Sequence, residues 1–304
     1  MAHHTTRRRL LRGSGSLAML ALAGCLGGDD DGMDDGTTSA ADGMDDDGMD
    51  DDGMAETSTD EEGGMNEGED SMMETATVTV RVENAAPVDF YPDDASTNGA
   101  VWFTPGAYAV HTGENPVYTA GEVASVGLEA LAEAGPPTGF EGEPGLVDEL
   151  GDSMDVVHAG AYTPEDTVAD PNDPMGEVPG APPIAPGGAF EFDVEAEPGH
   201  RLSLASMFVP SNDVFVSADS AGIPLWPEDG GPVDGDVSDH LLFLDAGTEP
   251  NAEPPGFGPD QAPAQDAPAQ GDDENGVVRP LSAVDDGHDY PAVTDAIRVT
   301  LTPQ

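Results

Sequence analysis

Two short acidic turns hold the residues whose types and spacing best fit a chemical role. The turns 210–213 and 245–249 each follow an apolar run directly, so each places carboxylates at the mouth of a predicted strand. If the two strands end on the same side of a sheet, Asp213, Asp245 and Glu249 converge. Calcium binds six to eight oxygens at about 2.3–2.6 Å, from carboxylates, carbonyls and water. The turns could therefore supply a calcium site, but in so acidic a chain the residues alone favour ordinary solvated turns.

Other familiar chemistries leave no motif in the chain. It has no Gly-x-Ser-x-Gly elbow, His-Glu-x-x-His zinc site, phosphate loop or dinucleotide fingerprint after its N-terminal segment. The histidines at 111, 158, 200, 240 and 288 share no metal-ligand spacing, and Cys25 is the only cysteine. We therefore expect no enzyme. A hydrolase that uses Asp245 and Glu249 as an acid–base pair stays open as a weaker alternative.

The charge balance restricts the possible partners. The chain has 62 acidic residues against 8 basic ones, for a formal net charge of -54, and it contains no lysine. Such a surface repels nucleic acid and anionic membranes, because phosphate binding requires cationic side chains. Strong salt would screen the self-repulsion, since the screening length falls to about 3 Å at molar ionic strength. The composition indicates a halophilic protein that does not bind nucleic acid.

Residues 1–24 have the pattern of an export signal. Arg8 and Arg9 lie in a basic run, which is followed by the short apolar stretch 17–23 and then by Leu-Ala-Gly-Cys ending at Cys25. The paired arginines resemble a twin-arginine signal, and the tetrapeptide resembles a lipobox in which the cysteine is lipidated. We expect a lipoprotein at the extracellular face of the cell membrane, attached to it through the lipid anchor only.

Residues 25–74 then form a low-complexity acidic spacer. It repeats Gly-Met-Asp-Asp blocks and contains no aromatic residue after the signal. Such a composition cannot bury enough apolar area to offset the entropy of ordering, so we expect a disordered linker that like charges extend. Its predicted role is a tether for the domain that follows.

Residues 75–304 predict one mainly β domain. Apolar residues alternate with polar ones in several short runs, as strands with one buried face require. The runs are 78–82, 190–194, 202–208 and 297–301, and the fully apolar run 241–244 fits a central strand. The runs on either side of the turn 198–199 predict a hairpin. One short helix is expected over 126–134, and the Pro- and Gly-rich stretches 164–188 and 250–276 are expected as loops. The pattern predicts an antiparallel β-sandwich with long loops.

Several stretches of this domain, in order, resemble the spondin N-terminal domain family. They are 127–133, 198–203, 207–215, 244–249, 261–263 and 290–293, and the Ser-Asn-Asp and Asp-Ala-Gly-Thr motifs are the most specific of them. The resemblance implies a β-sandwich with calcium held by loops at one end, and it assigns the ligands to Asp213, Asp245 and Glu249. Glu249 departs from the family's Asp at that position and is one methylene longer. Val214 stands where animal members carry Trp.

The motifs, the charge and the predicted fold leave three candidate functions. The first is a lipid-anchored extracellular calcium-binding module that binds or adheres to an unknown protein or glycan. The second is a solute-binding lipoprotein of a transporter, which would need many more helices than the pattern predicts. The third is the secreted hydrolase. We favour the first, although likeness of fold alone does not transfer function.

Overall fold

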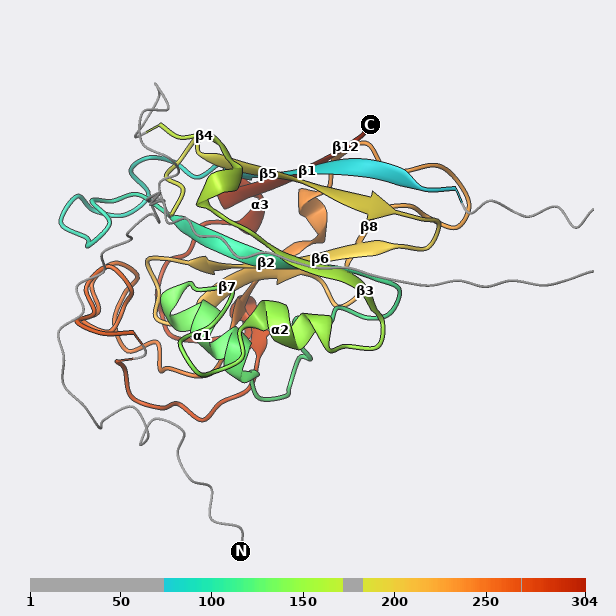
Figure 1. Cartoon of the computed structure of the whole chain (residues 1–304). Coiled ribbons are helices and arrows are strands. Elements are labelled where there is room, and N and C mark those ends of the chain that lie inside the picture. The colour runs from blue at the N-terminus through green and yellow to red at the C-terminus, as the bar shows by residue number, and fades with distance from the viewer. Residues whose placement is uncertain (1–73, 172–182, 269) are drawn as a thin grey trace, which may run out of the picture. The chain divides into compact units, whose positions relative to one another are not determined.

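Two antiparallel sheets lie face to face in the computed structural model (Figure 1), which describes residues 74–171, 183–268 and 270–304. The first sheet has the order β4-β5-β1-β12-β9, formed by Thr167–Ala169, Ala189–Ala196, Ala76–Asn84, Ile297–Pro303 and Gly235–Asp236. The second has the order β11-β10-β7-β6-β2-β3 with β8 also paired to β6, formed by Arg279–Pro280, Leu241–Asp245, Val214–Ala218, Arg201–Phe208, Phe103–His111, Val156–Tyr162 and Ile223–Pro224. The predicted β-sandwich is confirmed.

The main core fills the space between the sheets. Alternation places one face of each strand there, as in β1, where Val78, Val80 and Val82 are buried while the residues between them are partly exposed. From the second sheet come Phe103, which stacks on Phe243 with ring centroids 6.2 Å apart, and other aromatic side chains. The two sheets are therefore held by one continuous apolar layer.

Two helices cover the outer face of the seven-stranded sheet (Figure 1). Helix α1, Val126–Ala134, has the predicted bounds. The Ser125 side chain caps its first turn by accepting from Leu128 N, and Gly135 ends it in the left-handed conformation with φ 91°. Helix α2 is Leu146–Gly151, and α1 and α2 enclose a second, smaller core against the sheet.

The predicted single helix is thus joined by shorter ones. Besides α2, the structure has α3, Val293–Ala296, and the 3-10 turns η2, η3 and η4 at Pro164–Asp166, Ser238–His240 and Leu281–Ala283. These segments are too short to show a helical period in the sequence. The stretch 164–188 also contains β4, whereas the described part of 250–276 has no helix or strand, as expected.

The hairpin predicted around the turn 198–199 is wrong. Strand β5 pairs with β1 and β4, whereas β6 pairs with β2, β7 and β8, so the turn connects the two sheets. Both strands turn apolar residues toward the same core, such as Phe190 and Leu204. Alternation identifies the buried face of a strand but not its hydrogen-bonded neighbour, and here the neighbours come from distant parts of the chain.

Candidate metal centre

Asp213 and Asp245 meet at one end of the seven-stranded sheet. Asp213 lies in the turn between β6 and β7, and Asp245 is the last residue of β10. Strands β7 and β10 pair antiparallel with Asp245 opposite Val214, so the start of one strand adjoins the end of the other. The condition that the sequence left open, that the two turns lie at the same end, is therefore met.

The third carboxylate beside this pair belongs to Glu274. Within the described residues, Asp213, Asp245 and Glu274 each offer an oxygen that lies within 4.8 Å of the others. The two aspartates are fully buried, and Glu274 is partly exposed, with 23% of its side chain accessible. We call these three residues the acidic cluster.

One oxygen of Asp213 organises the turn after β10. Asp213 Oδ2 accepts hydrogen bonds from the backbone N–H groups of Thr248, at 2.9 Å, and Glu249, at 3.1 Å. Gly247 makes this turn possible, because it has φ 68° and a Cβ there would lie 2.5 Å from Val277 N. The other oxygen, Oδ1, is buried and has no hydrogen-bond partner. A buried carboxylate oxygen without a partner is costly, so this atom needs a proton, a water or a cation beside it.

Arg279 partly balances the acidic cluster. Its Nε lies 3.1 Å from Asp245 Oδ1, without the geometry of a hydrogen bond, and its Nη2 donates to Glu274 Oε1 at 2.9 Å. Asp245 Oδ2 accepts from Asn251 Nδ2 at 2.5 Å. When the three carboxylates are ionised, the one guanidinium leaves two of their negative charges uncompensated.

Burial makes that charge unfavourable. It raises the pKa of Asp213 well above its usual range, and the nearby Asp245 carboxylate adds to the effect, against the two backbone N–H bonds. Burial also raises the pKa of Asp245, although Arg279 and Asn251 oppose it. A divalent cation at the cluster would remove the repulsion and supply a partner for Asp213 Oδ1. The oxygen-only donor set fits a hard cation such as calcium.

Glu249, the third ligand expected from the sequence, is not among the three carboxylates of the acidic cluster. Its backbone N–H donates to Asp213, and its side chain is buried. Its carboxylate lies against Gly271, where a Cβ would come within 2.4 Å of the carboxylate carbon. The Glu249 backbone helps to shape the turn, and Glu274 is the third carboxylate of the acidic cluster. Coordination of an ion by Glu249 stays a prediction. Glu274 lies far along the chain from both turns in a stretch expected as loop, so no local pattern singled it out.

A second buried polar group lies elsewhere in the same sheet. His111 on β2 contacts Ser203 on β6, with Nε2 2.8 Å from Oγ, and its Nδ1 lies 3.2 Å from the carbonyl oxygen of Gly113. Because a carbonyl can only accept, Nδ1 carries the proton and Nε2 accepts from the serine hydroxyl. Both residues are fully buried, and burial lowers the pKa of His111. Gly222 packs over both side chains, so the pair fits a structural role.

The described residues begin at residue 74. The predicted export and lipidation residues Arg8, Arg9 and Cys25 therefore lie outside them, as does the predicted spacer except for its last residue. In the part of the chain that the structure describes, no helix is both long and apolar enough to cross a membrane. No protein-family model matches this chain, and neither does any curated protein.

Proposed function

We propose that this chain is an exported, lipid-anchored surface module whose sandwich end binds calcium. The observation that carries the proposal is the fully buried Asp213 Oδ1, which has no hydrogen-bond partner and belongs to a cluster with two uncompensated negative charges. A divalent cation would satisfy both the atom and the charge. The anchor and export route rest on Cys25 and on Arg8 and Arg9.

The cation would hold three separate segments together. The acidic cluster draws on the β6–β7 turn, the end of β10 and the segment that leads into β11. An ion bound to the folded form alone stabilises it by mass action. Its role is thus structural, and it stiffens the loops at this end of the sandwich. Loop ends of this kind are where a scaffold presents binding residues, so the partner would be an extracellular protein or glycan.

The test is a thermal melt of the full chain in concentrated KCl, with calcium and then with a chelator, beside the variants Asp245→Asn and Asp229→Asn. We expect calcium to raise the melting temperature of the wild type and of the exposed control Asp229→Asn but not of Asp245→Asn. A wild type that melts at the same temperature with calcium and with chelator would exclude the metal site. Recovery of a Cys25→Ser variant in the membrane fraction of the producing cells would exclude the lipid anchor.

A further inference from the structure

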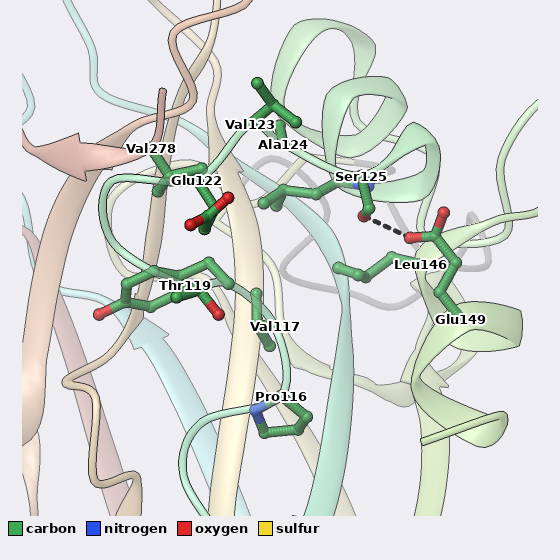
Figure 2. A pocket seen from close by; sticks show the side chains of 12 residues that line it. Pro116, Val117, Thr119, Glu122, Val123, Ala124, Ser125, Leu146, Glu149 and Val278 are labelled. Carbon is green, nitrogen blue, oxygen red and sulfur yellow. Dashed lines mark hydrogen bonds between the residues drawn. The ribbon is translucent and has the colours of Figure 1, made fainter. Parts of the chain in front are cut away.

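A pocket of about 230 Å³ lies on the helix-covered side of the seven-stranded sheet (Figure 2). Its floor is apolar and is formed by Val117, Leu128, Leu146 and Val278, each almost completely buried. These side chains belong to the second core, so the pocket is a place where that core opens to solvent. None of the residues of the acidic cluster lines it.

The pocket is formed before any ligand arrives. One wall is the segment 116–125, which is tied to Val278 by two backbone hydrogen bonds of 2.8 Å, from Gly121 N to Val278 O and from Val278 N to Glu122 O. At the end of that segment, Ser125 caps α1 and so fixes where the helix starts. A preformed pocket avoids the cost of ordering its walls when a ligand binds.

Two carboxylates face the pocket from opposite sides (Figure 2). Glu149 on α2 accepts from Gly127 N at 3.0 Å and from the Ser125 hydroxyl, so it is fixed at the start of α1. Glu122 comes from the opposite wall and is exposed to solvent. Among the described residues that line the pocket, none is Lys, Arg or His, and the Tyr118 hydroxyl already donates to Ala218 O at 3.2 Å. The pocket therefore offers hydrogen-bond acceptors and negative charge above an apolar floor.

We propose that this pocket binds an alkylammonium group, that is, an apolar stem that ends in a positively charged amine. The stem would cover Leu128, Leu146 and Val278, and the negative charges of Glu122 and Glu149 would attract the ammonium. A carboxylate or phosphate would be repelled by both glutamates, and a neutral apolar group would leave them without a counter-charge. Two sources carry this chemistry, a free amine and a lysine side chain of a partner protein.

The test uses the full chain with labelled methyl groups and follows their NMR shifts during titration at the lowest salt that keeps the protein folded. The probes are hexylammonium, hexanoate, hexanol and the amide of N-acetyl-lysine. We expect hexylammonium to shift the methyls of Val117, Leu146 and Val278 and to bind at least tenfold more tightly than hexanoate. Glu122→Gln should weaken it about two- to fivefold, as for other solvent-exposed ion pairs. The equally exposed Glu228→Gln lies outside the pocket and should change nothing.

The outcomes separate the alternatives. Equal binding of hexylammonium and hexanol would overturn the proposal, as would an unchanged affinity in Glu122→Gln. Ala124→Leu, which fills the pocket from its wall, should abolish the shifts, and shifts that persist would place the ligand elsewhere. If the lysine derivative binds as well as hexylammonium, the site takes a protein side chain, whereas binding of hexylammonium alone indicates a free amine.

Discussion

The acidic cluster at the end of the seven-stranded sheet and the His111–Ser203 pair within that sheet both contain fully buried side chains, yet they differ in how their polar atoms are satisfied. Both ring nitrogens of His111 have partners, and burial lowers the pKa of the ring and so favours its neutral form. The acidic cluster keeps an oxygen of Asp213 without a partner, and Arg279 balances only part of its charge. Burial of a titratable group therefore does not indicate function by itself. The informative feature is a buried polar atom whose partner the protein does not provide.

The largest expected effect concerns Asp213. With calcium at about a thousandfold excess over its dissociation constant, binding should add roughly 4 kcal/mol to the free energy of unfolding of the wild type. Asp213→Asn should lose this gain. With chelator the variant should be at least as stable as the wild type, because it removes a buried charge and keeps an oxygen for the Thr248 and Glu249 N–H groups. Denaturant unfolding with and without calcium measures both values, and an equal calcium gain in the variant would contradict the assignment.

The His111–Ser203 pair should behave in the opposite way. His111→Phe keeps a ring in the core but leaves the Ser203 hydroxyl and the Gly113 carbonyl without their partner. The expected loss is about 1–3 kcal/mol in the free energy of unfolding, the same with calcium and with chelator. A loss of stability that depended on calcium would show that the two regions are coupled and would contradict the contrast drawn between them.

The dependence of stability on pH should distinguish the regions by sign. The folded-state pKa of Asp213 lies above its ordinary value of 3.8. With chelator present, the contribution of Asp213 to the free energy of unfolding therefore falls as the pH rises from 3.8 through the folded-state pKa. The folded pKa of His111 lies below 6.5, so its contribution is lost as the pH falls below that value. A tenfold difference in proton affinity between the folded and unfolded chains corresponds to about 1.4 kcal/mol of stability.

Melting temperatures measured with chelator between pH 4 and 8 should separate these effects. Asp213→Asn should be at least as stable as the wild type at neutral pH, and any advantage should shrink toward the acid end, where the wild-type carboxyl is protonated. His111→Phe should lose less stability toward the acid end than the wild type does. With calcium present, the wild type should no longer gain stability toward acid pH, because protons that bind the carboxylates then displace the ion. Identical pH profiles for the wild type and Asp213→Asn would show that Asp213 keeps an ordinary pKa.

The smallest effect separates Glu274 from Glu249. If Glu274 is the third ligand, Glu274→Gln should weaken calcium binding about fivefold, or roughly 1 kcal/mol, while Glu249→Gln should change affinity less and stability more. Calcium titrations followed by calorimetry measure the affinities. The reverse order would support the ligand set expected from the turn alone.

Much of this fold could be predicted from local patterns. Helix α1 was predicted with its observed bounds, because the signal that ends it, Gly135, directly follows its last residue. Alternation likewise identified β1, β5 and β12, because the two-residue period of a strand shows in a few residues. Asp213 and Asp245 were also found from sequence, since each directly adjoins an apolar strand.

The tertiary structure decided everything that depends on residues far apart in the chain. It placed β5 and β6 in different sheets, because the choice of neighbouring strand follows from the packing of the whole core. It brought Glu274 and Arg279 to Asp245 through the pairing of β10 with β11, and it turned the Glu249 carboxylate toward Gly271. The sequence by itself determined the core-facing residues of β1, β5 and β12 and where turns carry charge, since both show in near neighbours. Strand register decided which charges meet. Register depends on many weak contacts between residues that are far apart in the chain, so local patterns do not reveal it.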